Sequence, residues 1–331
     1  MAELAEVSTA TVSYTFNMPE KVRPETRERV LAASEELGFR PNVLARALRK
    51  GKHAMVGIIV SDIQTPYVAS IVRSAQEALE RADQIGVVVS TDGQSDTIRG
   101  AIENLVDRGV AAFVICPIPF RCDEETIDYF LELGRRGILI SLISNSMDEF
   151  PGDVVNTKSR LAAAAMVEYL VSLGHRRIAW IGRPTGPELV GMNRQNGFID
   201  GLKAAGLELI VDAALDMDSG LRAADQLLSL DNPPSAVLAI ADVVAAGFLM
   251  GCYRAGLTVP QDISVAGLND DPIARQVWPR LTTMRPARQE SGSTAVKLLV
   301  ERQQDESLPP RKPALDFELV IRESTGPPAA D

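Results

Sequence analysis

Short apolar runs alternate with amphipathic stretches along most of the chain from Met55 onward. The runs are rich in β-branched residues and short, which is typical of buried strands. Between the first two runs, the apolar residues of Val68–Ala82 recur at helical spacing and predict an amphipathic helix. The strands predicted from this pattern are Met55–Val60, Gly86–Ser90, Ala112–Cys116, Ile138–Ile143, Ile178–Ile181, Ala236–Ile240 and Ile263–Leu268.

The alternation of strands and helices predicts an α/β fold with parallel sheets covered by helices. The strands fall into two groups, one before and one after about Phe150, which favours two doubly wound subdomains with a cleft between them. A late helix over Glu290–Gln303 and a strand over Asp316–Ile321 would carry the chain back and tie the subdomains together.

The first fifty residues follow a different pattern and predict a small all-α head. Three short segments separated by tight connections are expected to be helices: Ala2–Glu6, Ser8–Phe16 and Pro24–Leu37. This is a helix-turn-helix arrangement with a supporting helix, which is a common way to bind DNA. On spacing alone, a solvated helical hairpin is the alternative.

The second predicted helix has one inward and one outward face. Ser8 can cap it, because its hydroxyl can accept a free backbone N–H of the first turn. Val12 and Phe16 lie four residues apart and would face inward. The outward side chains are small or polar and suited to base edges or phosphates: Thr9, Ala10, Ser13, Tyr14 and Asn17.

The third predicted helix has start and stop signals of its own. Pro24 suits its first turn and Gly38 its C-terminal cap. Val30, Ala33 and Leu37 are expected to form its buried stripe.

Charge is distributed unevenly along the chain. The net charge is −10, but residues 1–52 hold nine Lys/Arg and seven Asp/Glu, so the head carries +2 and the remainder −12. An acidic body repels the phosphate backbone, and DNA contact would therefore be confined to the head. The three cysteines (Cys116, Cys122, Cys252) and two histidines (His53, His175) lack metal-ligand spacing, so neither a metal nor another cofactor is expected.

Several other functional classes lack their sequence signatures. The longest apolar runs are far shorter than the roughly 20 residues that cross a bilayer. The first residues, Met-Ala-Glu-Leu-Ala-Glu, lack the features of a secretory signal, which favours a cytoplasmic protein without membrane contact. No dinucleotide or Walker-type glycine loop and no hydrolase elbow occurs, so an enzyme is not expected.

Longer motifs carry a specific resemblance. Those of the head are Val7–Ser13, Asn17, Thr26–Ala33 and Glu36–Arg49. Those of the body are Gly57–Val60 with Thr65–Tyr67, Leu173–Ala179, Arg194–Phe198, Val259–Gly267 and Leu281–Pro286. In this order they resemble the lactose-repressor family of bacterial transcription regulators over essentially the whole chain.

The resemblance implies a homodimeric repressor that binds operator DNA and is controlled by a small-molecule effector, a sugar or sugar derivative. It also implies that the two subdomains are lobes of the periplasmic-binding-protein type. The implied domains are a helix-turn-helix head over 1–41, a hinge helix and linker over 42–52, and a two-lobed body over 53–331. The lobes would comprise about 53–156 with 286–315, and 157–285 with 316–331.

The resemblance also assigns the DNA contacts. It places Thr9, Ala10 and Tyr14 toward bases. It places toward phosphates Ser8, Thr11, Ser13, Asn17, Lys21, Arg23 and Thr26. In the hinge, Asn42 begins the helix, and Ala45 and Leu48 approach the minor groove, where the paired Leu48 side chains wedge a base step apart. Without the resemblance, Leu48 would be interpreted as an ordinary packing leucine.

The head departs from the family pattern at three points. Met1 falls inside the first helix, which leaves a shortened helix to support the second. Glu6 stands at the turn position where glycine is usual and would be strained if that position needs a positive φ. Tyr14 replaces the usual arginine, which predicts a different operator sequence.

By the same resemblance the effector lies between the lobes. Tyr67 would be a stacking ring and Arg194 the charged anchor, together with Lys158, Met217, Asp242 and Asn269. Asn269 stands where the family has an aspartate, and Lys158 adds a positive charge. We therefore hypothesise an anionic effector, a sugar acid or a sugar phosphate. The alternative function is a periplasmic-type binding protein or sensor whose degraded head does not bind DNA.

Overall fold

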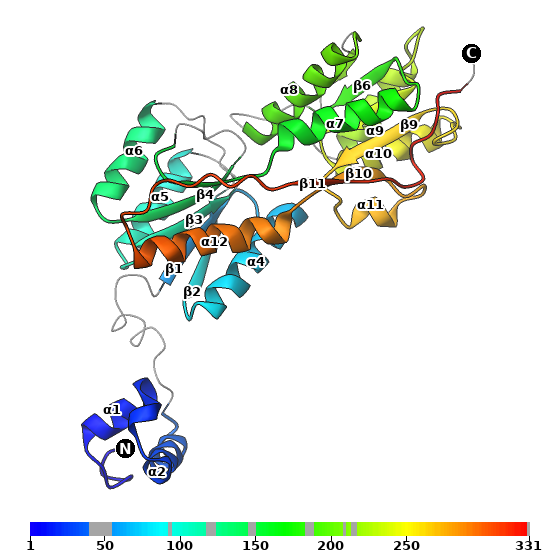
Figure 1. Ribbon diagram of the computed structural model, residues 1–331. Coiled ribbons are helices and arrows are strands. Elements are labelled where there is room, and N and C mark those ends of the chain that lie inside the picture. Colours follow the sequence, from blue (N-terminus) through cyan, green and yellow to red (C-terminus); the bar gives the residue numbers. More distant parts are fainter. Residues whose placement is uncertain are drawn as a thin grey trace. The chain divides into compact units, whose positions relative to one another are not determined.

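The computed structural model describes residues 1–39, 55–91, 95–116, 124–144, 150–182, 189–207, 210–212 and 217–329. The chain forms two compact units, Met1–Ala54 and Met55–Asp331 (Figure 1). Each unit has a hydrophobic core of its own. Within the described residues, no helix combines the length and apolar character needed to cross a membrane.

The head contains helices α1 (Thr9–Asn17) and α2 (Pro24–Glu36), with a 3-10 turn, η1 (Pro19–Lys21), between them. The predicted cap at Ser8 is confirmed, because its Oγ accepts the backbone N–H of Thr11 at 3.1 Å. The predicted helix over Ala2–Glu6 is wrong, since these residues form turns. They are too few for a regular helix, and the chain leaves the helical region at Glu6, where φ is +51°.

The core of the head is small. It consists of Ala5, Val30 and Ala33, and Val12 and Phe16 pack against it as predicted. The predicted burial of Leu37 is wrong. That side chain is 54% exposed, because α2 ends at Glu36 and the chain reverses at Gly38, whose φ is +59°.

Two contacts form where the chain reverses after α2. Ser34 is buried, and its hydroxyl donates to the carbonyl oxygen of Phe39 at 2.9 Å. The ring of Phe39 lies 5.9 Å from that of Phe16, measured between centroids. The reversal of the chain at Gly38 therefore brings Phe39 against Phe16 at the edge of the head, although Phe39 itself is 48% exposed.

The body contains two sheets. The first has the order β2-β1-β3-β4-β5 and is wholly parallel. Its strands are β1 (Met55–Val60), β2 (Ile85–Ser90), β3 (Ala112–Cys116), β4 (Leu139–Ser144) and β5 (Asp153–Asn156). The second has the order β11-β10-β9-β8-β6-β7, in which only the pair of β10 and β11 is antiparallel. Its strands are β6 (Ile178–Ile181), β7 (Ile210–Asp212), β8 (Ala236–Ala239), β9 (Ser264–Leu268), β10 (Thr282–Pro286) and β11 (Phe317–Val320).

The α/β prediction is confirmed, with every predicted strand present within one or two residues. Strands β5, β7 and β10 were not predicted. They are short or carry polar residues and a proline, so they lack the apolar run that marks the other strands.

Helices connect and cover the strands (Figure 1). They are α4 (Pro66–Arg81), α5 (Ser95–Val106), α6 (Glu124–Arg135), α7 (Ser159–Ser172), α8 (Leu189–Ala204), α9 (Met217–Leu228), α10 (Asp242–Arg254), α11 (Ile273–Gln276) and α12 (Arg288–Gln304). Helix α12 follows a strand of the second sheet but packs against α4 on the first. Strand β11 then returns to the second sheet, so the predicted return crossing is confirmed.

Helices α4 and α12 touch at a point where only glycine fits. A Cβ built on Gly292 would lie 2.1 Å from the Oγ of Ser74 and 2.4 Å from the backbone oxygen of Ile71. This close approach fixes α12 on α4, and with it Arg288 at the first turn of α12.

A buried ionic contact holds the other end of α12. Asp153 of β5 is almost fully buried and accepts hydrogen bonds from Arg302 of α12 at 2.9 Å and from Arg311 at 2.9 to 3.2 Å. Burial alone would raise the pKa of Asp153, but the two guanidinium groups outweigh it and hold that pKa below its ordinary value. The ionised carboxylate therefore links α12 and the crossing segment to the first sheet.

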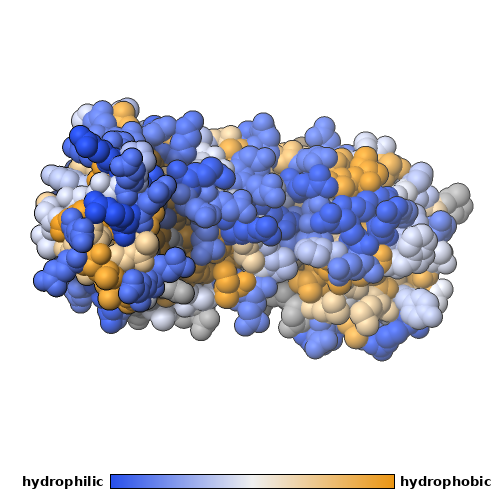
Figure 2. Space-filling view, turned by 90° about the horizontal axis from the view of Figure 1, so that it is seen from below, coloured by the Kyte–Doolittle hydropathy of each residue, from blue (hydrophilic) through white to orange (hydrophobic). Residues whose placement is uncertain are grey.

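The surface is largely polar on the face seen in Figure 2, where hydrophilic residues predominate and apolar residues form separate groups. Isolated exposed apolar side chains are normal for folded proteins. Two aromatic ones stand out among the described residues: Tyr253 of α10 is 85% exposed and Trp278, just after α11, is 82% exposed.

Candidate ligand cavity and nucleic-acid interface

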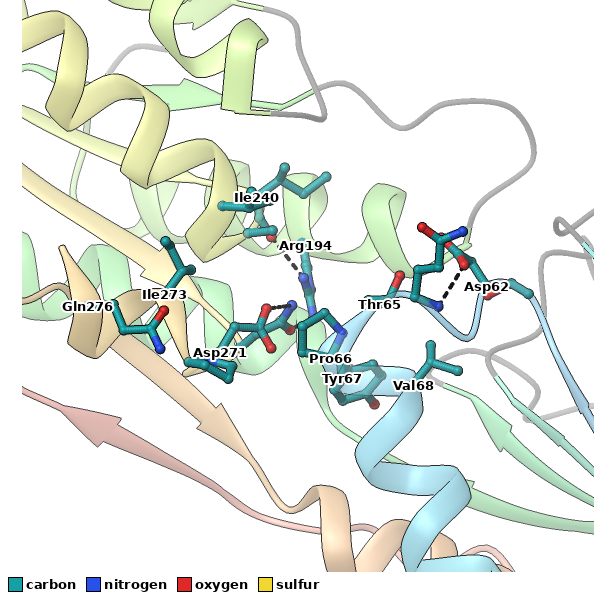
Figure 3. Close-up of a pocket in the computed structure, with 16 residues that line it drawn as sticks. Asp62, Thr65, Pro66, Tyr67, Val68, Arg194, Ile240, Asp271, Ile273 and Gln276 are labelled. Atoms are coloured by element: carbon teal, nitrogen blue, oxygen red, sulfur yellow. Dashed lines mark hydrogen bonds between the residues drawn. The ribbon is translucent and has the colours of Figure 1, made fainter. Parts of the chain in front are cut away.

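A cavity of about 610 Å³ lies between the two sheets of the body, at the carboxyl ends of β1, β8 and β9. Its volume is in the range of small-molecule sites, and this edge of parallel sheets is where such sites usually form. One wall comes from the segment that joins β1 to α4, and the other from α8 and the residues that follow β8 and β9 (Figure 3).

The walls combine aliphatic surface with a few polar groups. The polar lining residues are Ser61, Asp62, Gln64, Thr65, Arg194, Asn269, Asp271 and Gln276. The others are Pro66, Tyr67, Val68, Ile240, Ala241, Val243, Pro272 and Ile273. Such a mixture suits a small molecule that has both an apolar face and hydroxyl groups.

Arg194 reaches the cavity from α8 and is fixed against the second sheet. Its Nη1 donates to the carbonyl oxygen of Ile240 at 2.8 Å, and its Nη2 donates to Oδ1 of Asn269 at 2.6 Å. Asn269 has a φ of +127°, and its Nδ2 donates to Oδ2 of Asp271 at 3.2 Å. These contacts join α8 to the turn after β9.

Tyr67 contributes to the cavity wall and to the core of the first sheet. Burial raises the pKa of its phenol, an effect that Cys116 adds to and Arg194 opposes. The guanidinium carbon of Arg288 lies 6.0 Å from the centroid of the ring. Tyr67 is therefore a neutral, well-packed side chain that presents only a small part of its surface.

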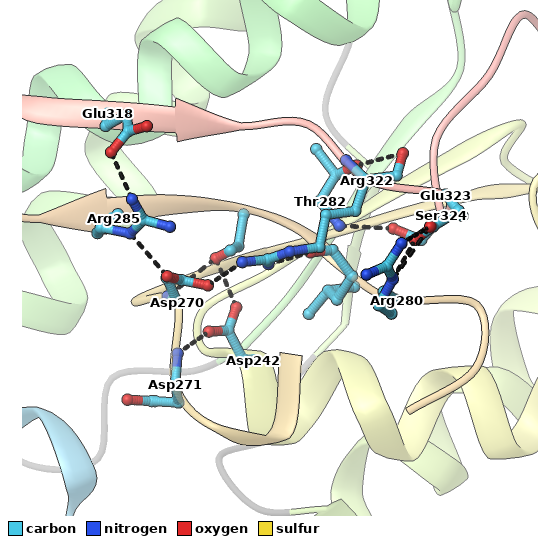
Figure 4. Close-up of polar contacts among 12 residues, drawn as sticks. Asp242, Asp270, Asp271, Arg280, Thr282, Arg285, Glu318, Arg322, Glu323 and Ser324 are labelled. Carbon is cyan, nitrogen blue, oxygen red and sulfur yellow. Dashed lines mark hydrogen bonds and ion pairs between the residues drawn. The ribbon is translucent and has the colours of Figure 1, made fainter. Parts of the chain in front are cut away.

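Asp242, expected to contact the effector, does not line the cavity. It is 0% exposed at the start of α10. Its Oδ1 accepts the hydroxyl of Thr283 and its Oδ2 accepts the backbone N–H of Asp271, both at 2.6 Å (Figure 4). Burial raises the pKa of Asp242 to about 7, and the nearby Asp271 and Asp270 add to this rise. Asp242 therefore shapes the turn that lines the cavity.

Lys158 and Met217 also lie outside the set of cavity-lining residues. The Nζ of Lys158 is 2.7 Å from Oδ1 of Asp316, so its charge is paired away from the cavity wall. Met217 is the first residue of α9, and its backbone oxygen packs against Gly247 of α10. The electrostatic argument for an anionic effector therefore loses the cation on which it rested.

Tyr67, Arg194 and Asn269 are the members of the predicted set that the structure brings together. Sequence reasoning missed Asp62 and Asp271 among the polar lining residues. A usable signal was present, because both follow predicted strands by two or three residues, at the edge where parallel sheets bind ligands.

Ion pairs of Asp270 hold the turn after β9 in place. Asp270 has a φ of +53° and is buried, and its carboxylate accepts from Nε of Arg285 at 2.7 Å and from Arg322 (Figure 4). Burial alone would raise the pKa of Asp270, but the two arginines outweigh it and lower that pKa. Arg285 also donates to Glu318 of β11 at 2.6 Å, so the turn is fastened to the β10–β11 pair.

The head presents the predicted DNA-facing residues on its surface. Those with exposed side chains are Ser8, Thr9, Ala10, Ser13, Tyr14, Lys21 and Arg23, and those half-buried are Thr11 and Thr26. Asn17 is the last residue of α1. The hinge residues Asn42, Ala45 and Leu48 lie outside the described residues. Glu6 adopts the positive φ expected of the turn position, so the predicted steric strain there has its geometric basis.

Where the structure describes the chain, it places no group of three or more His, Cys, Asp or Glu side chains that could hold a metal ion.

Comparisons with known proteins agree with this arrangement. Residues 1–42 match bacterial regulatory proteins of the lacI family, and residues 167–325 match the periplasmic binding protein-like domain. The HTH-type transcriptional repressor CytR of Escherichia coli (strain K12) is 29% identical over 327 residues, which cover 97% of this chain and 94% of that protein.

Solved structures also match over nearly the full length. A lac repressor dimer bound to operator and the anti-inducer ONPF is similar with a TM-score of 0.84 and 25% identity, covering 98% of this chain and 97% of that one. The transcriptional regulator CelR in complex with cellobiose has a TM-score of 0.72 and 26% identity, covering 98% of each chain. The chain therefore combines a helix-turn-helix head that matches the lacI family of bacterial regulatory proteins with a two-sheet body that matches the periplasmic binding protein-like domain.

Proposed function

We propose that the protein is a transcriptional repressor that binds operator DNA through its head and is controlled by a sugar or sugar derivative bound in the body cavity. The carrying observation is that one chain joins a capped α1 helix with an exposed polar face to a body that encloses a cavity of about 610 Å³. Two similar structures support this proposal: the lac repressor dimer is bound to operator and the anti-inducer ONPF, and CelR is in complex with cellobiose.

In this proposal α1 enters the major groove. Thr9, Ala10 and Tyr14 face bases, since their side chains are exposed on α1. The phosphate contacts come from Ser8, Thr11, Ser13, Asn17, Lys21, Arg23 and Thr26. Asn42, Ala45 and Leu48 form the hinge that reaches the minor groove, within a linker over 42–52.

The repressor acts as a homodimer, because one small head offers few base contacts and two half-sites multiply affinity. The exposed aromatics Tyr253 and Trp278 support a contact between two copies through α10 and the segment after α11, a helix that packs on α10. We place the protein in the cytoplasm, where its DNA lies, and assign it no catalytic activity. The named relatives are a repressor and transcription regulators.

In vitro selection tests DNA recognition by the full-length protein. Random duplex DNA is enriched on the protein and sequenced, and the expected product is a palindromic motif with two half-sites. Enrichment of no motif, with ligand binding retained, would contradict the repressor and favour the binding protein with a defective head, for which the strained Glu6 is the supporting observation.

The salt dependence of binding tests the phosphate contacts. Lys21→Gln is expected to reduce the slope of log affinity against log salt by about one, because one ion contact is lost. Lys203→Gln is the matched control, since Lys203 is an exposed lysine of the body. Equal slopes for the two variants would show that Lys21 does not contact phosphate.

A further inference from the structure

Asp271 combines burial with unused hydrogen-bonding capacity at the cavity. It follows β9, lines the cavity and is 5% exposed. Its Oδ2 accepts from Asn269, but within the described part of the chain its Oδ1 accepts no hydrogen bond. This oxygen is ion-paired with the guanidinium of Arg288 but takes part in no hydrogen bond there, so it can still accept one from a ligand or water. In Figure 4 the carboxylate of Asp271 points away from Asp242, which holds its backbone.

A cation from the half of the body that holds the first sheet contacts this carboxylate. Nη1 of Arg288, at the first turn of α12, lies 3.2 Å from Oδ1 of Asp271 and forms an ion pair with it. Helix α12 packs on the first sheet, whereas Asp271 extends from the second. The pair therefore bridges the two halves of the body. Burial raises the pKa of Asp271, and the guanidinium of Arg288 opposes this rise, because a nearby cation favours the charged form.

The charges of the cavity wall do not favour an anion. Among the lining residues that the structure describes, Arg194 is the one cation, and its guanidinium donates to Ile240 and Asn269. Two carboxylates, Asp62 and Asp271, line the same cavity. An anionic ligand would lie against these carboxylates with little compensation, whereas hydroxyl groups can donate to them.

We propose that Asp271 binds the effector directly, by accepting hydrogen bonds from its hydroxyl groups, and that the effector is a neutral sugar. This inference rests on the proposed effector cavity and replaces the expectation of a sugar acid or sugar phosphate. The family aspartate expected at position 269 is here Asn269, whose amide orients the carboxylate two residues later. Arg288 is a positioning residue that holds the carboxylate of Asp271 from across the cleft.

Isothermal titration of the full chain without DNA tests the proposal. The probes are D-ribose, D-glucose, cellobiose, D-gluconate and D-glucose 6-phosphate. At least one neutral probe is expected to bind, and at least ten-fold more tightly than either anion. Binding of only the anions, or of none of the five probes, would overturn the inference.

Substitutions at Asp271 then test its direct contact with the sugar. Asp271→Asn is expected to weaken the bound sugar by about 10- to 100-fold, the usual effect of losing charge-assisted hydrogen bonds. Asp271→Glu keeps the charge but displaces the carboxylate by one methylene, and is also expected to weaken binding at least about five-fold. Asp107→Asn, at an exposed aspartate of the body, should bind as wild type.

A double variant separates ligand contact from charge balance. If Asp271 only neutralised Arg288, then Asp271→Asn with Arg288→Gln would recover wild-type affinity. The proposal predicts that the double variant binds as weakly as Asp271→Asn alone. Thermal unfolding confirms that each variant is folded, and Asp271→Glu retains the test if Asp271→Asn is not. Retained operator binding with wild-type sugar affinity in Asp271→Asn would overturn this inference and leave the repressor proposal standing.

Discussion

The buried carboxyl of Asp242 makes the stability of the body depend on pH. Its pKa rises from 3.8 to about 7 in the folded chain, chiefly because burial disfavours the charged form. Between these two values the unfolded chain has released the proton and the folded chain retains it, so the free energy of unfolding falls as pH rises. At about 1.4 kcal/mol per pKa unit, the total is roughly 4 kcal/mol, of which roughly 2–3 kcal/mol falls between pH 5 and pH 8.

Asp242→Asn isolates this contribution. Asparagine cannot titrate, and the hydrogen bond it loses to Thr283 or Asp271 has the same effect at every pH. The difference in unfolding free energy between wild type and variant is therefore expected to change by roughly 2–3 kcal/mol between pH 5 and pH 8, in favour of the variant at the higher pH.

Urea unfolding followed by tryptophan fluorescence measures this difference in unfolding free energy at each pH. Trp180 is fully buried in the same core cluster as the residues around β8 and β9, so it reports the unfolding of this half of the body. Asp107→Asn should change in parallel with wild type, since Asp107 is exposed. A constant difference between wild type and Asp242→Asn across the pH range would refute the reasoning.

Three further substitutions test other parts of the structure. Glu6→Gly should stabilise the head by about 1 kcal/mol, because φ is +51° there, and slow hydrogen exchange in residues 1–39; unchanged exchange would contradict it. Arg302→Met should lower the free energy of unfolding in urea by about 3 kcal/mol, because it removes an ion-pair partner of the buried Asp153. A decrease below about 1 kcal/mol would contradict the stabilising role of this ion pair. Gly292→Ala should destabilise the body by about 1–3 kcal/mol, because its Cβ would contact Ser74 and Ile71. Gly100→Ala in α5 is the control and should not destabilise the body, because the space around Gly100 is open. Equal stabilities of the two variants would refute the close packing of α4 and α12.

The sequence predicted the regular parts of the fold well, because buried strands and amphipathic helices leave a periodic signal. It missed β10, whose Thr-Thr-Met-Arg-Pro run has no such period. It also misplaced Leu37, because the chain reverses at Gly38 and leaves that side chain exposed. Family resemblance located Arg194 and Asn269 at the cavity.

The direction of individual polar side chains could not be predicted in the same way. Asp242 is turned into the protein by Thr283 and the backbone of Asp271, and Lys158 is drawn to Asp316, which lies 158 positions away along the chain. Such contacts depend on tertiary packing, which brings together groups that no local pattern relates.

The coupling between cavity and DNA is the central claim, and operator affinity measured with and without bound sugar tests it most directly. Fluorescence anisotropy on the selected operator is expected to change in midpoint by about 5- to 150-fold when a sugar that binds the cavity is added. Arg194→Met should abolish this change while retaining DNA binding, because it removes the contacts to Ile240 and Asn269. A sugar that binds the wild-type protein in isothermal titration but leaves its operator affinity unchanged would contradict the coupling between cavity and DNA.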